Sequence, residues 1–223
     1  MIGSRVRVIT PLVLILALCG LPQPVVSQNL LVPMDRAQGN HLRAYGLTYW
    51  TLEQGDTVEW LLNYRGGSFL LPDSEAVRRE AAFRGVSFEP IGSAQLAEIR
   101  SIIQGENMEA VPLETAPRIA IYTPPNVPPW DDAVTMALTY AEISYETIWD
   151  PEVLTGDLSQ YEWLHLHHED FTGQYSKFYL TYAGADWLQE EIARNRDVTA
   201  RFGFSDVPDL KRAVSEEIRS YVE

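Results

Sequence analysis

Short strand candidates alternate with amphipathic stretches through the second half of this 223-residue chain. The strand candidates occupy residues 118–122, 145–149 and 161–167, and a stretch with its apolar side chains at helical spacing separates the first two. Strands buried on both faces are typically continuous apolar runs, whereas a helix lying on a sheet shows one apolar stripe. The alternation therefore predicts an α/β fold in which helices cover both faces of a parallel sheet.

The first half of the chain also alternates helix candidates with short strand candidates. Helices are expected at residues 40–54, 73–84 and 93–104, strands at 57–63 and 86–90, and later helices after Asp131, at 186–196 and from Pro208 onward. Residues 105–117 are polar and contain prolines, so we expect a boundary there. These features divide the sequence into a leader at 1–27, an N-terminal α/β segment at 28–115 and a second α/β domain at 116–223.

The leader has the pattern of a signal peptide. Arg5 and Arg7 precede an apolar run of eleven residues at 11–21, and Ser27 provides the small residue of a cleavage site. The run is too short to span a bilayer, which takes about 20 residues. We therefore expect export to the periplasm or the medium. Anchoring as a lipoprotein through Cys19 and retention as an uncleaved N-terminal anchor are the alternatives.

Cys19 is the sole cysteine of the sequence, and it lies inside this leader. Cleavage would leave 196 residues with no disulfide, no thiolate metal ligand, no cysteine nucleophile and no stable membrane span. The full chain has 17 basic and 31 acidic side chains, and its formal net charge of -14 becomes -16 when the two leader arginines are removed. This charge argues against a nucleic-acid partner, because phosphate contacts need a basic surface.

Three of the four histidines lie together near the end of the strand expected at 161–167. Because side chains alternate along a strand, His165 and His167 share one face, and His168, Glu169 and Asp170 follow at its carboxyl end. Open α/β sheets bind their ligands at that end. We expect His167, His168, Glu169 and Asp170 as a catalytic group, or His165, His167 and His168 as ligands of a divalent metal. A polar strand end that is hydrogen-bonded to loops is the structural alternative.

Two loops are candidate ligand-binding segments. The candidate residues are Asn63, Arg65, Gly66, Gly67 and Ser68 in the first loop, and Asn126 and Trp130 in the proline-rich second loop. Glycines let backbone N–H groups approach an anion, and Arg65 could pair with a carboxylate or phosphate. Trp130 could stack on a sugar or another ring. The alternative for the first loop is a turn that requires positive φ, with Arg65 in a structural ion pair. The alternative for the second loop is that it only covers the sheet.

The stretch RIAIYTPPNVPPWDDAVTMALTYAEISYETIWD, with LSQYEWLHLHHEDF after it, resembles the opening of class I glutamine amidotransferase-like domains. The chain after its leader, including NHLRAYGLTYW and VEWLLNYRGGSF, resembles a family of secreted bacterial proteins, mostly from the Bacteroidota, that are often labelled asparagine synthetase B. The resemblance implies a flavodoxin-like, three-layer sandwich with a mostly parallel sheet. It also implies a nucleophile on a turn after a later strand, which would follow IRSYVE, so we expect an incomplete, C-terminally truncated domain.

The chemistry of asparagine synthesis does not fit this chain. Ile2 stands where such enzymes carry a catalytic cysteine after Met1, and no Ser-Gly-Gly loop for pyrophosphate is present. No Gly-x-Ser-x-Gly nucleophile turn occurs either. We expect a non-catalytic binding or scaffold module whose partner is a small molecule or an envelope protein. The alternative is an envelope hydrolase or ligand-processing enzyme, assisted by a metal at the histidines, whose nucleophile lies beyond the end of this chain.

Overall fold

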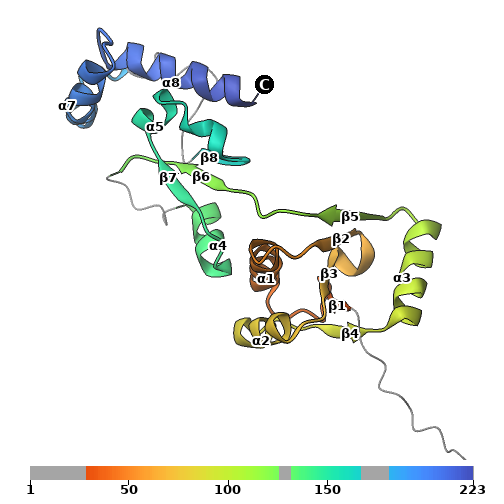
Figure 1. Cartoon of the computed structure of the whole chain (residues 1–223). Helices are drawn as coiled ribbons and strands as arrows, with labels where there is room; N and C mark the ends of the chain where they lie inside the picture. The colour runs from red at the N-terminus through yellow and green to blue at the C-terminus, as the bar shows by residue number, and fades with distance from the viewer. Residues whose placement is uncertain (1–28, 126–131, 167–180, 223) are drawn as a thin grey trace, which may run out of the picture.

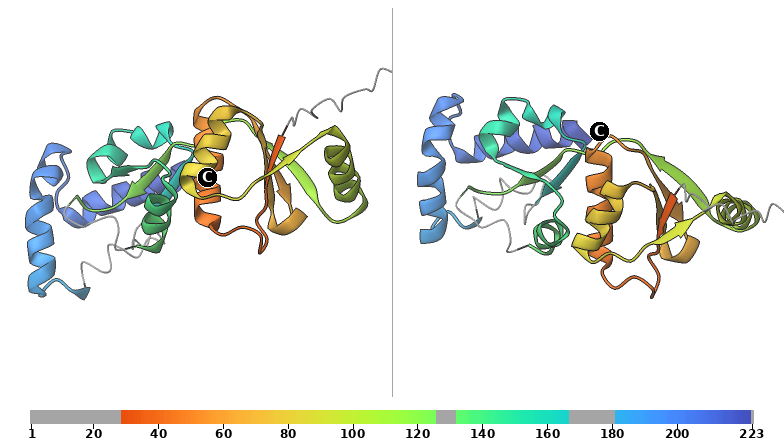
Figure 2. Two further views of the ribbon diagram at one scale, coloured as in Figure 1. Left: turned by 90° about the horizontal axis from the view of Figure 1, so that it is seen from below. Right: turned by 60° about the horizontal axis from the view of Figure 1, so that its bottom comes forward.

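The computed structural model describes residues 29–125, 132–166 and 181–222, which form two α/β lobes side by side (Figures 1 and 2). The N-terminal lobe contains β1 (Asn29–Val32), α1 (His41–Glu53), β2 (Val58–Leu62), a 3₁₀ turn (Tyr64–Gly66), β3 (Ser68–Pro72), α2 (Glu75–Arg84), β4 (Glu89–Ile91), α3 (Ser93–Gly105) and β5 (Glu109–Leu113). The C-terminal lobe contains β6 (Ile119–Tyr122), α4 (Ala133–Ala141), β7 (Glu146–Ile148), α5 (Asp150–Leu154), a 3₁₀ helix (Asp157–Gln160), β8 (Trp163–Leu166), α7 (Asp186–Arg201) and α8 (Val207–Val222). The predicted α/β class is confirmed.

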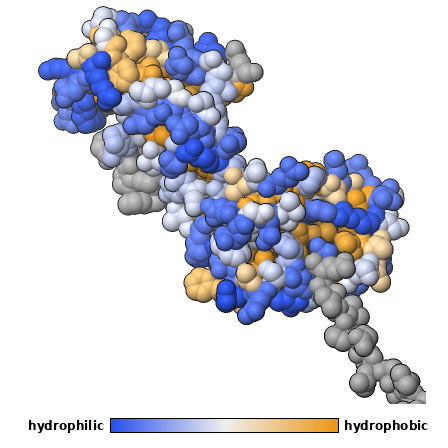
Figure 3. Space-filling model, viewed as in Figure 1, coloured by the Kyte–Doolittle hydropathy of each residue, from blue (hydrophilic) through white to orange (hydrophobic). Residues whose placement is uncertain are grey.

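The N-terminal lobe is a sheet between two layers of helix. Its strands lie in the order β4-β1-β3-β2-β5, with α1 and α2 packed on one face and α3 on the other. Alternate residues of β1 serve the two cores, since Leu30 and Val32 face α1 while Leu31 faces α3. Figure 3 shows a mostly hydrophilic surface, with apolar residues gathered where α3 meets the sheet.

The prediction of a parallel sheet is wrong for this lobe, because each of its strand pairs is antiparallel. Alternating strands and helices do not by themselves fix strand direction. The deciding feature is the hairpin between β2 and β3, where Asn63 (φ 65°) and the glycines 66 and 67 reverse the chain in the left-handed region. The expected boundary at 105–117 also contains β5, an edge strand that tolerates Pro112.

The C-terminal lobe carries the parallel sheet that the alternation predicts. The three strands lie in the order β7-β6-β8, and both pairings with β6 are parallel. Ile119 and Ile121 pack with α4 on one face, while Ala120 and Tyr122 pack with α8 on the other. α7 packs in turn on α8. No helix among the described residues is long and apolar enough to cross a bilayer.

The two lobes meet where α1 packs against the end of α4. Gly46 makes this contact close, since a Cβ on it would lie 1.8 Å from the carbonyl oxygen of Ala141. The same carbonyl accepts a hydrogen bond of 2.9 Å from Nη1 of Arg84, and Arg84 and Arg43 both pair with Glu142. The interface thus combines a close backbone approach with charge pairing between the lobes.

Candidate functional site

The strands of the parallel sheet end together at one edge of the C-terminal lobe. β6, β7 and β8 end at Tyr122, Ile148 and Leu166, and we call this the carboxyl edge. The chain continues from β6 and from β8 at this edge. In open α/β folds, side chains at this edge are those that reach bound ligands.

His165 and Asp132 form a hydrogen-bonded pair on the α4 side of the carboxyl edge. His165 is the next-to-last residue of β8 and lies opposite Ile121 of β6 in the parallel register. Its Nε2 lies 2.9 Å from Oδ2 of Asp132, and the two side chains are only 19% and 13% exposed. Asp132 is also the N-cap of α4, where Oδ1 accepts from the backbone N–H groups of Val134 (2.5 Å) and Thr135 (3.3 Å).

These contacts keep the Asp132 carboxyl ionised. Its burial works to raise the pKa, but the hydrogen bonds from His165 and from the two N–H groups outweigh burial, and the pKa lies below its ordinary value. An ionised carboxylate only accepts hydrogen bonds, so Nε2 of His165 must be the donor. Within the described residues, Nδ1 of His165 makes no hydrogen bond.

Replacing Asp132 with alanine is expected to lower the free energy of unfolding by about 0.5–2 kcal/mol near neutral pH, because α4 loses its cap. Since the folded-state pKa is depressed, this stabilisation is present above the ordinary carboxyl pKa and is lost as pH falls through the lowered value. Urea unfolding of both proteins at several pH values measures the difference. Asp132→Ser, which retains a capping oxygen, should recover part of the loss; a gap that stays constant into the acid range would contradict this account.

Thr123 adds an unsatisfied polar group to the same edge. It follows β6 directly, and its N–H continues the ladder by donating to the carbonyl of Ile148 at 3.1 Å. Alternation along the strand places its side chain on the face of Ile121, which is also the face of His165. The residue is 3% exposed, and its hydroxyl has no hydrogen-bond partner in the part of the chain that the structure describes. Because a buried hydroxyl is normally paired, this one needs an explanation.

A second polar cluster lies on the opposite, α8-facing side of the carboxyl edge. Asp150, directly after β7, accepts a 2.5 Å hydrogen bond from the Tyr122 hydroxyl and pairs with Nζ of Lys211 at 2.7 Å. Both charged side chains are at most 2% exposed, and Nζ also lies 3.9 Å from the ring centre of Trp149. Lys211 is thus enclosed by Asp150 and Trp149, and we assign this cluster a structural role in fixing α8 to the sheet.

Of the predicted His-rich group, the structure places His165 alone. His167, His168, Glu169 and Asp170 lie outside the described residues, as do Asn126 and Trp130. Within residues 29–125, 132–166 and 181–222, no three His, Cys, Asp or Glu side chains gather as a metal-binding group. Catalysis by the His-rich group and metal binding by His165, His167 and His168 therefore stay predictions.

The loop around Arg65 is a turn with positive φ in which Arg65 forms ion pairs within the chain, as in the structural alternative to a ligand-binding loop. Arg65 itself has a positive φ of 44°, and its guanidinium donates to Asp35 at 2.7 Å and to Glu89 at 2.9 Å. A Cβ on Gly66 would lie 2.4 Å from the carbonyl of Met34, so glycine is required for this close approach. Asn63, Gly67 and Ser68 complete the hairpin: the Asn63 amide donates to the carbonyl of Asn107, and the Ser68 hydroxyl donates to that of Arg65.

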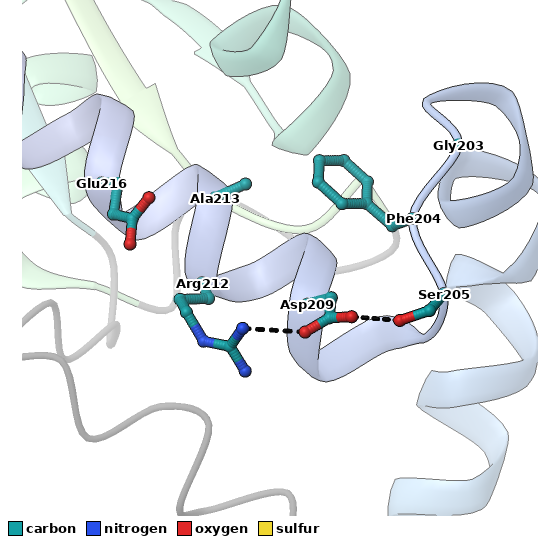
Figure 4. A pocket seen from close by; sticks show the side chains of 7 residues that line it. All are labelled: Gly203, Phe204, Ser205, Asp209, Arg212, Ala213 and Glu216. Atoms are coloured by element: carbon teal, nitrogen blue, oxygen red, sulfur yellow. Dashed lines mark hydrogen bonds and ion pairs between the residues drawn. The ribbon is translucent and has the colours of Figure 1, made fainter.

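Two open hollows lined by described residues lie away from the carboxyl edge. One, of about 540 Å³, lies at the start of α8, where Ser205 donates to Asp209 and Asp209 pairs with Arg212 (Figure 4). The other, of about 460 Å³, lies between the end of α4 and β7. Asp209 and Arg212 of the first hollow pair with each other and Glu216 is exposed, so neither hollow presents an unsatisfied buried group comparable to Thr123.

No family model, curated protein sequence or solved structure matches this chain. The functional argument therefore rests on the residues of the carboxyl edge and on the strand order that brings them together.

Sequence reasoning missed most of the side chains that form the carboxyl edge. Asp131 and Asp132 were both interpreted as helix-capping acids; Asp132 is the cap, but its pairing with His165 was not expected. Thr123 lay in a loop considered only for its prolines. Lys211 could have been singled out from the sequence, because it is one of two lysines and lies beside the apolar stripe of the last helix.

Proposed function

We propose that this protein is an exported small-molecule-binding module built on a class I glutamine amidotransferase-like, flavodoxin-like fold, with its ligand at the carboxyl edge. The signal-peptide pattern of residues 1–27 supports export. The strand order supports the fold, because β7-β6-β8 places the first strand between the second and third, as in the flavodoxin-like order 2-1-3-4-5.

The strand order also supports the location of the site. In flavodoxin-like sheets, ligands bind outside the carboxyl ends of the strands, where the chain switches direction across the sheet between the first and third strands. Those strands correspond to β6 and β8. Thr123 follows β6 and His165 lies on β8, so the polar side chains of the carboxyl edge lie at this switch point.

The observation that carries the proposal is the buried hydroxyl of Thr123, which has no partner among the described residues and lies on the same face of the sheet as the His165–Asp132 pair. A buried hydroxyl without a partner costs about 1–3 kcal/mol, and a ligand that bonds to it would recover that free energy. The imidazole is held in place from one side by Asp132, so its orientation is fixed before a ligand arrives. Such preorganisation lowers the entropic cost of binding.

Ligand-observed NMR with a panel of free amino acids and monosaccharides tests the proposal. We expect at least one compound to bind the purified chain and to lose tenfold or more in affinity in Thr123→Val and His165→Ala, in line with about 1.4 kcal/mol or more for the lost contacts. Thr147→Val, an exposed threonine of β7 in the same sheet, is the matched control and should bind as wild type. Binding that neither site variant changes would overturn the proposal.

A ligand-processing enzyme is the second candidate, favoured by the orientation of His165. One ring nitrogen of His165 is held by the Asp132 carboxylate and the other makes no hydrogen bond among the described residues, which is the arrangement of a general base with its orienting acid. In this case Nδ1 would take the proton from a bound water or hydroxyl group. A hydrolytic activity lost in both His165→Ala and Asp132→Ser would favour this candidate over pure binding.

A further inference from the structure

An exposed tryptophan lies on the same face of the parallel sheet as the candidate site, and the inference drawn from it rests on the proposed function. Trp163 is the first residue of β8, two residues before His165, so alternation along the strand places both side chains on one face. Leu164 and Leu166 point to the other face and pack in the core beneath α8. Trp163 is 41% exposed, although tryptophan side chains are on average highly buried.

The fold makes little use of the Trp163 side chain. Its register partner Ile119 belongs to the core cluster beneath α4, and Trp163 does not. Among the described residues, the indole takes part in no hydrogen bond and no contact with another aromatic ring. The backbone is fixed, since the N–H of Trp163 donates to the carbonyl of Arg118 at 3.3 Å. The indole is therefore held in place while its ring is available to a ligand.

Trp163, His165 and Thr123 lie in a row along this face of the sheet. Tyr122 lies opposite Leu166, so Thr123 extends one residue beyond that pair. With a rise of about 3.3 Å per residue, the row covers roughly 7 Å from Trp163 to His165 and roughly 13 Å from Trp163 to the level of Thr123. A single sugar ring or a free amino acid is about as long as half of this row. A ligand that contacts both ends needs two linked rings or an equivalent length.

The chemistry of the row changes from aromatic to polar along its length. An aromatic ring attracts flat, partly apolar surfaces by stacking, and a pyranose ring presents such a surface on its C–H face. Sugar hydroxyls both donate and accept, so they can bond to the Thr123 hydroxyl and to the imidazole of His165 in any protonation state of that ring. Pockets for small molecules typically combine aromatic walls with a few polar groups in this way.

We propose that the ligand of the carboxyl edge is a saccharide of at least two rings. One ring stacks on Trp163, and the next forms hydrogen bonds with His165 and Thr123. Trp163 is then the residue that determines ligand length, because a monosaccharide held at the polar end does not reach it. The polar end binds a single ring by itself, which is the binding that the proposed function requires.

Isothermal titration calorimetry on the full chain tests this inference with cellobiose, maltose and chitobiose, each compared with its own monosaccharide and with adenosine. We expect at least one disaccharide to bind about tenfold or more tightly than its monosaccharide. Trp163→Ala should remove this advantage and leave monosaccharide binding unchanged, while Trp163→Phe keeps part of it. Phe83→Ala removes a 78% exposed aromatic ring from α2 in the other lobe and is the matched control.

Circular dichroism verifies that each variant is folded, and Trp163→Thr, a substitution that favours strands, replaces the alanine variant if that one is not. The inference is overturned if each disaccharide binds no more tightly than its monosaccharide, if the advantage survives in Trp163→Ala, or if adenosine binds more tightly than the disaccharides. Each of these results leaves a site that Thr123→Val weakens. The proposed function itself fails if Thr123→Val and His165→Ala leave binding unchanged, so the two failures are distinguishable.

Discussion

Lys211→Met is expected to lower the free energy of unfolding by about 3–5 kcal/mol, the largest effect we predict for a single substitution. The change removes the ammonium group that neutralises Asp150, a carboxylate with no exposed surface. Asp150 would keep its hydrogen bond from Tyr122 but would be left as an uncompensated buried charge. The loss of the contact between Nζ and the Trp149 ring adds to the cost. Urea unfolding followed by circular dichroism and tryptophan fluorescence measures the change.

The next residue along the helix provides a matched control for this substitution. Arg212 pairs with Asp209 on the surface, where its side chain is 56% exposed, so Arg212→Met should change stability by no more than about 0.5 kcal/mol. The double variant Asp150→Asn with Lys211→Met should lose much less than Lys211→Met alone, because no unpaired charge remains. A cost below about 1 kcal/mol for Lys211→Met would contradict the role assigned to this pair.

Gly46→Ala is expected to cost about 1–3 kcal/mol, because the added Cβ would lie 1.8 Å from the carbonyl oxygen of Ala141. That oxygen belongs to the backbone and accepts from Arg84, so it cannot move aside without weakening the contact between the lobes. We expect α1 and α4 to separate, with faster proteolysis of the segment joining β5 to β6. Chemical unfolding and limited proteolysis of the variant measure the two effects.

Gly105→Ala is the control for this second substitution. Gly105 is also a helical glycine, at the end of α3, and a Cβ there would meet no atom within 4 Å. Alanine should therefore stabilise the protein by about 0.5–1 kcal/mol at Gly105, through its better helix propensity. A similar gain at Gly46 would show that the lobes do not approach each other as closely as described.

The parts of the fold that the sequence predicts are those with local signals. For the helix expected at 73–84, the sequence offers Asp73 or Ser74 as the N-cap and Gly85 as its end; α2 begins after Ser74 and ends at Gly85, and both residues show the backbone geometry that caps require. β1, β3 and β5 were missed because each is a run of four or five residues whose neighbours suggested something else: a leader, a glycine-rich loop and a polar boundary. Apart from the hairpin between β2 and β3, strand direction in the first sheet depends on pairings between distant segments, such as β1 with β3 and β2 with β5, which no local pattern encodes.

The candidate site shows the same division between local and long-range information. The position of His165 near a strand end is a local feature, and the sequence predicts it. Its pairing with Asp132, 33 residues earlier, arises only when α4 packs on the sheet and brings its first turn to the carboxyl edge. That the Thr123 hydroxyl lacks a partner among the described residues is likewise a property of the packed structure, since it depends on what surrounds that atom.

The central claim, that the carboxyl edge binds a small molecule, is tested most directly by mapping a bound compound onto the backbone. The measurement is the change in amide NMR shifts of the ¹⁵N-labelled chain as the strongest binder of the amino-acid and monosaccharide panel is added. The account predicts that the shifts concentrate at Tyr122–Thr123, Asp132–Thr135 and His165–Leu166, and that Thr123→Val weakens them. Shifts confined to the hollow at the start of α8 or to the N-terminal lobe would contradict it.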